Sequence, residues 1–174
     1  TCGGFIQFPW PESISRRDIG NNINPNKACL ERLIDEAKKN TECILDSTIM
    51  NKLKKKADYL TIGIDSFKEK ISTTKNHIGK PHVELVLLID LKNGNIHHCG
   101  KSYPTPSQQR GLVRYTDLSS HFFADDDLKK ILILGCHDLA VFNPRSINAK
   151  EWRADTNRNI KILVVQEDPS YVLH

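Results

Sequence analysis

The spacing of apolar residues predicts two helices in the first third of the chain. Asn24 and Pro25 have the residue types of a helix cap and a first helical position. The apolar residues that follow recur with the i, i+3, i+4, i+7 spacing of one helix face, namely Leu30, Leu33, Ile34 and Ala37. A second helix is expected to be capped by Asp46 or Ser47 and to carry Ile49, Met50 and Leu53.

From residue 58 the spacing becomes that of β-strands. Residues 59–65 are rich in β-branched and aromatic side chains, as strands are. The polar segment 66–80 suggests a loop or a short helix. Residues 83–91 form a nearly continuous apolar run, which is typical of a central strand buried on both faces. The pair Asn93-Gly94 favours a two-residue hairpin turn, so residues 95–103 are predicted to return antiparallel.

The last third of the chain predicts a strand–helix–strand unit. Residues 131–134 read as a short buried strand that ends at Gly135. We expect residues 136–142 to form a connecting loop and a helix to run over 143–157. Residues 160–165 would form a final buried strand. A crossover of this kind makes its two strands parallel.

Together these elements predict a single α/β domain over residues 1–174, with a mixed sheet, a central hairpin and helices packed on the sheet. The length suits one sizeable core. Residues 1–24, with Pro9-Trp10-Pro11, are expected to form an extended arm that packs its aromatic rings on the body; stacking on a ligand is the alternative. Because the chain begins with Thr1 rather than Met, we expect it to be a processed or excised piece of a larger protein.

Composition and charge narrow the classes of protein to consider. No apolar run approaches the roughly 20 residues that span a bilayer, so no membrane partner is expected. The five cysteines are odd in number and never form a C-x-x-C pair, which predicts free thiols and a cytoplasmic location. The net charge of +4 permits an anionic partner. The basic run 52–56 favours a solvated helix end, with a phosphate-binding patch as the alternative.

The first candidate for chemistry is Cys136, His137 and Asp138, which follow a buried strand where α/β proteins place their active sites. Cys136 could act as a nucleophile, or His137 as a general base. In an extended segment Cys136 and Asp138 share one side, so a cysteine hydrolase would need His97 or His98 from the hairpin. In the alternative, Cys136 is a small core residue and Asp138 caps a turn.

The order of a histidine and then a cysteine, each after a strand, loosely resembles the layout of caspase-type proteases. The chain lacks the Ser-His-Gly and Gln-Ala-Cys segments of that family. The resemblance would imply Cys136 as the nucleophile.

The second candidate lies on the hairpin. An apolar strand that ends in Asp90-x-Lys92, with Asp58 or Asp65 on the preceding strand, resembles the PD-(D/E)xK nuclease arrangement, although no proline precedes either aspartate. The resemblance implies that Asp58 or Asp65 and Asp90 hold a divalent cation such as Mg²⁺. Lys92 would position or activate the attacking water. In the alternative, Asp90 and Lys92 are solvated residues of an ordinary hairpin.

The third candidate is an anion site at the start of the predicted last helix. Asn143 would cap this helix, and its free N–H groups would face the same edge as Cys136. Arg145 in the first turn opposes the helix dipole, and a bound phosphate, sulfate or nucleotide would compensate for it. His97 and Cys99 share a face of the hairpin, but two ligands do not make a zinc site, so a structural role is favoured.

Three functions remain open. The leading prediction is a hydrolase that acts on a phosphate-bearing substrate, nucleic acid or a nucleotide. Its more specific form is a metal-dependent nuclease. The second is a cysteine hydrolase with Cys136 as nucleophile. The third is a non-catalytic domain that binds a ligand or protein within a larger protein.

Overall fold

A four-stranded mixed sheet forms the centre of the computed structural model, which describes residues 5–66, 81–105, 108–109, 111–124, 130–142, 152, 164, 167, 169 and 171–173. Its strands lie in the order β1 (Phe5–Phe8), β2 (Tyr59–Ser66), β3 (Glu84–Asp90), β4 (Ile96–Gly100). β1 runs parallel to β2, and the other neighbours are antiparallel. The predicted mixed sheet, and the hairpin within it, are therefore confirmed.

The hairpin loop is longer than the predicted two-residue turn. Asp90 and Asn95 still share a ladder hydrogen bond, from the Asp90 N–H to the Asn95 carbonyl at 2.9 Å. Leu91 then leaves the ladder, because its side chain is buried and its N–H donates to the Asp58 carbonyl. Gly94 completes the turn with a φ of 79°, a conformation that glycine adopts without strain.

A second sheet is a departure from the single sheet that the sequence suggests. It contains β5 (Phe122–Ala124), β6 (Lys130–Ile133) and β7 (Tyr171–Leu173). β6 and β7 are parallel, as predicted for the end of the chain. The partner strand is β7 rather than residues 160–165, and the one described residue of that range, Val164, is helical.

The helices begin where side chains can accept the first free N–H groups. They are α1 (Arg16–Ile19), α2 (Lys27–Ile44), α3 (Ser47–Lys54) and α4 (Cys136–Phe142), with a 3₁₀ turn at Leu118–His121. Asn26 caps α2, two residues later than predicted, because Gly20 and Pro25 first form a β-bridge. The predicted cap of α3 is confirmed, since the Asp46 carboxylate accepts the Ile49 N–H.

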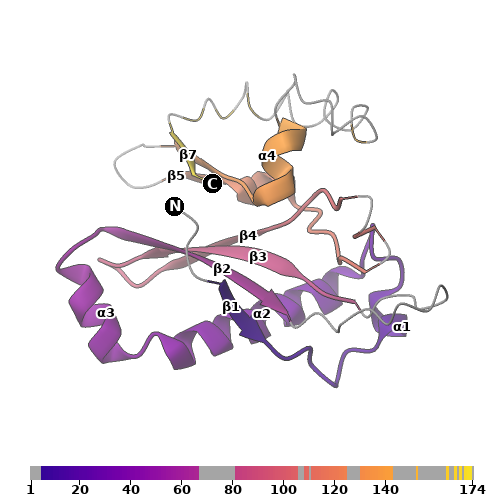
Figure 1. Cartoon of the computed structure of the whole chain (residues 1–174), viewed down its shortest axis with the longest axis horizontal. Coiled ribbons are helices and arrows are strands. Elements are labelled where there is room, and N and C mark those ends of the chain that lie inside the picture. The colour runs from indigo at the N-terminus through magenta and orange to yellow at the C-terminus, as the bar shows by residue number, and fades with distance from the viewer. Residues whose placement is uncertain are drawn as a thin grey trace.

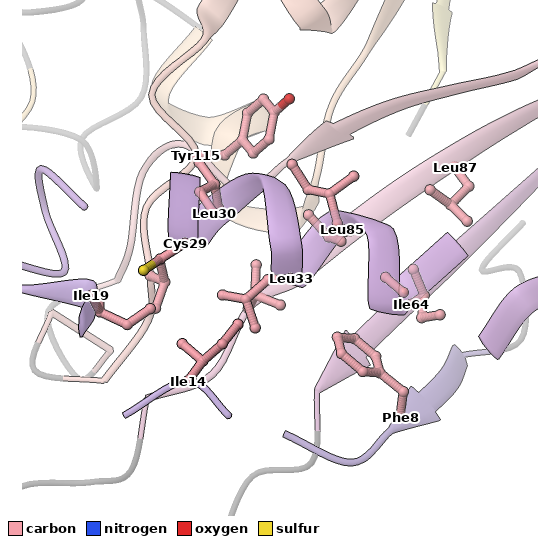
Figure 2. Packing of buried hydrophobic residues seen from close by; sticks show 14 residues of the cluster. Phe8, Ile14, Ile19, Cys29, Leu30, Leu33, Ile64, Leu85, Leu87 and Tyr115 are labelled. Atoms are coloured by element: carbon pink, nitrogen blue, oxygen red, sulfur yellow. The ribbon is translucent and has the colours of Figure 1, made fainter. Parts of the chain in front are cut away.

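The apolar face predicted for α2 packs on one side of the four-stranded sheet. Leu33 and Ala37 are fully buried, and Leu30 and Ile34 nearly so. Leu33 of α2 lies in the same core cluster as Ile64 of β2 and Leu85 of β3, all labelled in Figure 2. Phe8 of β1 also belongs to this cluster, so the predicted extended segment at the start of the chain forms an edge strand and packs an aromatic ring in the core.

The second sheet covers the opposite side of the four-stranded sheet. Leu88 and Cys99, which face away from α2, share a core cluster with Ile131 and Ile133 of β6. The molecule thus has three layers, with α2 on one side of the central sheet and the small sheet on the other, and α4 beside the small sheet (Figure 1). No helix in the described ranges is long and apolar enough to cross a membrane.

The predicted loop at 136–142 is wrong, because these residues form α4. The Leu139 N–H donates to the Gly135 carbonyl at 3.2 Å, so the chain turns into a helix directly after β6. Val141 is buried against Tyr103, which gives this short helix an apolar contact that the local sequence does not reveal. Of the helix predicted over 143–157, all but Trp152 lies outside the described residues.

Candidate functional site

Asp90 and Lys92 form a hairpin turn. One carboxylate oxygen of Asp90 accepts the N–H groups of Lys92 and Asn93, at 2.8 and 3.1 Å, and the other accepts the Asn93 side-chain amide. These hydrogen bonds, led by that from the Asn93 N–H, lower the pKa of Asp90. Lys92 is exposed. The two residues therefore have the ordinary hairpin arrangement that was the alternative to a catalytic role.

Asp65, one of the two aspartates predicted to join Asp90 around a cation, lies far from it. Tyr59 pairs with Asp90, whereas Asp65 pairs with Glu84. Six residues of strand separate Asp65 from Asp90, about 20 Å at 3.3 Å per residue, so a shared ion is excluded. Asp58 is exposed and precedes Tyr59, the partner of Asp90, so its predicted role beside Asp90 stays a prediction. Within the described part of the chain no group of three or more acidic, histidine or cysteine residues is placed to hold a metal ion.

A row of polar residues crosses the four-stranded sheet at the end opposite the hairpin. Gln7 pairs with Asp65, and Asp65 pairs with Glu84. Lys101 follows Gly100, the partner of Leu85, so it lies opposite Glu84 one step beyond the β3–β4 ladder; its N–H donates to the Glu84 carbonyl at 2.9 Å. Directly paired residues share a face, and this is the face that the second sheet covers. These four residues form the polar row.

Glu84 is the most connected member of the polar row. One of its carboxylate oxygens accepts the Lys101 ammonium and the other accepts the Gln108 side-chain amide, each at 2.8 Å. The His82 Nε2 atom lies 3.8 Å from the second oxygen. The side chain of Glu84 is 16% exposed and that of Lys101 is 6% exposed. The row thus lies at the boundary between the core and solvent.

Asp138 lies beside the polar row in a fully buried network. Its carboxylate accepts the N–H groups of Ser102, at 3.1 and 3.2 Å, and of Tyr103, at 2.9 Å. The Ser102 hydroxyl lies 2.8 Å from the His121 Nε2 atom, and the His121 Nδ1 atom lies 2.7 Å from the Ile133 carbonyl. Ser102, His121 and Asp138 are each 0% exposed, so none can meet a substrate in this conformation.

The pKa values in this network are set mainly by burial. Burial raises the pKa of Asp138 to about 7, against the N–H groups of Ser102 and Tyr103, which lower it. The charge of Lys101 also lowers this pKa and that of Glu84 raises it, so the polar row and Asp138 interact electrostatically. Burial lowers the pKa of His121. With Nδ1 donating to the Ile133 carbonyl, a neutral His121 accepts the Ser102 hydroxyl at Nε2.

Arg114 makes contacts that hold the segment with Lys101 and Ser102 in place. Its Nε–H donates to the Ser102 carbonyl at 2.5 Å. Its guanidinium lies 4.9 Å from the centre of the Tyr103 ring and 5.1 Å from that of the Trp152 ring, within the range of cation–π attraction. Asn143 and Arg145, the predicted anion site, lie outside the described residues, so that prediction stays open.

The partners predicted for Cys136 lie on opposite faces of the hairpin. His97 pairs with Leu88 and His98 with Leu87, so His97 faces the second sheet and His98 faces α2. The His97 Nε2 atom is 2.7 Å from the Ser120 carbonyl. Burial, followed by the charge of Lys38, lowers the pKa of His98 to about 4. The side chains of Cys136 and His137 lie outside the described residues, so the cysteine-hydrolase reading stays a prediction.

The shared face of His97 and Cys99 is confirmed, since Cys99 pairs with Val86. Cys99 is fully buried, and burial raises the pKa of its thiol. A structural role for this pair is consistent with that environment.

Comparisons with protein-family models, curated proteins and solved structures found no match for this chain.

Sequence reasoning missed Glu84, Lys101, Ser102 and His121 as site residues. A signal was available for Glu84, because it stands between Val83 and Leu85 in the most apolar stretch of the chain. Charged residues at such positions are rarely buried without a partner. Nothing local marks Ser102 or His121, which meet only when β4 and the 3₁₀ turn pack together.

Proposed function

We propose that this chain is a metal-dependent hydrolase of phosphate esters. Its active site would be the polar row, with Asp65, Glu84 and Lys101 as the functional residues. The leading prediction from the sequence placed two carboxylates and a lysine at the hairpin. The observation that carries the proposal is that two carboxylates and a lysine instead lie in one row across three neighbouring strands. Asp65 belongs both to the set predicted at the hairpin and to this row.

Like charges directly opposite one another on paired strands are destabilising. Asp65 and Glu84 stand in this relation, with Cβ atoms expected about 4.5–5.5 Å apart. Lys101 balances part of this negative charge through its bond to Glu84. A cation that contacts both carboxylates would further offset the repulsion, so the pair is compatible with a cation-binding role.

The donor set fits Mg²⁺, which is usually held by one or two carboxylates together with substrate phosphates and water. A carboxylate offers about four lone-pair sites, so Glu84 can keep its bonds to Lys101 and Gln108 and still coordinate an ion. When bound, the ion would act as a Lewis acid on the phosphoryl oxygens.

Residues of the chain would stabilise the transition state and orient the metal-binding carboxylate. Lys101, held by Glu84, would place a positive charge beside the phosphoryl group, where negative charge develops in the transition state. Gln108 would keep the Glu84 carboxylate in one orientation. The partial burial of Glu84 and Lys101 strengthens these electrostatic effects, because water screens them less.

The sequence next to the row supports a phosphate-bearing substrate, nucleic acid or a nucleotide. Residues 67–80, which directly follow Asp65 and Ser66, carry four lysines and one glutamate. A positive segment that follows a candidate hydrolytic centre in the sequence would favour an anionic substrate.

The proposal is tested by measuring hydrolysis of bis-(p-nitrophenyl) phosphate and of a labelled oligonucleotide with Mg²⁺ or Mn²⁺. Asp65→Asn and Glu84→Gln should each lower kcat by about 10²–10³-fold, the usual effect of losing one group that stabilises the transition state. Both variants should also lower Mn²⁺ affinity, measured by titration calorimetry.

Asp90→Asn is the matched control, because it removes the same charge at the other end of the same strand pair. It should leave both activity and Mn²⁺ affinity unchanged. Full activity in Asp65→Asn, or the absence of hydrolysis with every divalent cation tried, would overturn the proposal. In that case the Glu84–Lys101 pair is an internal salt bridge of a binding domain.

A further inference from the structure

Exposed lysines gather where α3 meets the β3–β4 hairpin. The Leu91 N–H donates to the Asp58 carbonyl at 2.8 Å, so the residues after α3 run beside the hairpin, near α3 at the left of Figure 1. All the lysines of this region are exposed. They form the lysine patch, which consists of Lys52, Lys54, Lys55, Lys56 and Lys92.

The helix dipole explains only part of this cluster. Lys52 and Lys54 lie in the last turn of α3, where a positive charge is favourable. Lys55, Lys56 and Lys92 lie beyond that turn, where the dipole effect fades. None of the ion pairs formed among the described residues involves the lysine patch.

The carboxylates close to the lysine patch leave its charge largely uncompensated. Asp90 already accepts three hydrogen bonds within the hairpin turn. The second nearby carboxylate is that of Asp58, the acidic residue between α3 and β2. Within residues 52–58 and 90–95, five ammonium groups therefore face solvent against two carboxylates.

We propose that the lysine patch binds the phosphate backbone of nucleic acid without reading its sequence. Ammonium groups are compact point charges, and the patch contains neither an arginine fork nor an aromatic ring that would recognise a base. Such a surface positions a nucleic acid through its phosphates. The patch lies at the opposite end of the β2–β3 pair from Asp65, so this proposal does not depend on the proposed catalytic centre.

A membrane surface fits the lysine patch less well. A helix that lies in a membrane interface buries its apolar face among the lipids. The apolar residues Met50 and Leu53 of α3 instead pack against Ile62 and Leu91 of the sheet. Of the apolar residues of α3, Ile49 is exposed, but Met50 and Leu53 are unavailable to lipid, which favours nucleic acid as the partner.

The test measures binding of a fluorescein-labelled oligo-dT by anisotropy over a range of salt concentrations. Each phosphate contact contributes about 0.7 to the slope of log K against log salt for a single strand. Replacing Lys54, Lys55 and Lys56 by Gln should therefore lower the slope by about 2 and weaken binding at about 50 mM salt by tenfold or more.

A variant with the same loss of charge elsewhere provides the control. Arg17, Lys27 and Lys39 are exposed residues of α1 and α2, and their replacement by Gln should change the slope by less than half as much. Equal weakening in both variants, no binding by the wild type, or binding to phosphatidylserine vesicles in place of oligo-dT would overturn the proposal. The binding assay contains no Mg²⁺ or Mn²⁺, so its outcome is distinguishable from a failure of the proposed metal-dependent catalysis.

Discussion

Asp138 illustrates how one residue's role depends on what surrounds it. The sequence places it two residues after Cys136 and suggests a partner of that thiol or a turn cap. In the structure its carboxylate instead receives the N–H groups of Ser102 and Tyr103, about 35 positions earlier in the chain. It joins α4 to the end of β4, and no solvent reaches it.

This burial predicts a specific dependence of stability on pH. Because the pKa of Asp138 is raised to about 7, the folded protein holds a proton that the unfolded chain has released above about pH 4. The contribution of Asp138 is therefore fully present below about pH 4 and is lost as the pH rises to about 7. Asp138→Asn should gain stability relative to the wild type over that range, as measured by urea unfolding.

The comparison with the variant is needed because His121 has the opposite effect. Its pKa is lowered by burial, so its contribution is present above its unfolded pKa and is lost as the pH falls. The difference between wild type and Asp138→Asn cancels that contribution. A difference that does not change between pH 4 and pH 8 would contradict the raised pKa. Asp138→Ala should cost stability at every pH, because it leaves two buried N–H groups without an acceptor.

At the scale of single elements, β4 depends on a close contact with a neighbouring loop. Gly100 lies against Tyr115, and a methyl group on Gly100 would stand 2.8 Å from three atoms of that side chain. Such a distance forces the strand or the ring to move. The glycine thus permits the close packing of Tyr115 on the end of β4, next to Lys101 and Ser102.

Gly100→Ala should therefore lower the free energy of unfolding by about 1–3 kcal/mol, the usual cost of overpacking a core. For a chain of this size that corresponds to a fall in Tm of about 2–4 °C per kcal/mol. Gly135→Ala is the control, because the nearest atom to its new methyl group is 3.5 Å away, an ordinary contact. Equal Tm values for the two variants would show that Tyr115 adapts freely.

For the whole molecule, the central sheet holds the two outer layers together through opposite faces of the same strand. Leu87 of β3 is buried in the cluster that contains α2, and Leu88 is buried in the cluster that contains β6. Strand alternation sends neighbouring side chains to the two layers. Each layer therefore depends on a different set of β3 residues.

Leu87→Ala and Leu88→Ala should each cost about 2–5 kcal/mol, as core leucine truncations do. Their local effects should differ. By native-state hydrogen exchange, Leu88→Ala should speed exchange most in β5 and β6, and Leu87→Ala most in α2. The same exchange pattern in both variants would mean that the layers unfold together.

The sequence by itself determined the elements that local spacing specifies. The apolar face of α2, the cap at Asp46, the strands β2 and β3 and the hairpin all follow from periodicity and turn chemistry that act over a few residues. The mixed α/β class follows from their order. These features could be predicted because each one satisfies its own backbone hydrogen bonds locally or with a sequence neighbour.

Only the tertiary structure decided which residues share a site. Whether Asp65 meets Asp90 or Glu84 depends on the register of β2 against β3. A strand pair brings together residues that are far apart in the chain, and no local pattern encodes that register completely. Likewise, residues 136–142 form a helix because Val141 and Asp138 find partners at Tyr103 and Ser102, and the second sheet forms because β6 pairs with β7 across a long crossover. The polar row and the buried network arise from these distant contacts.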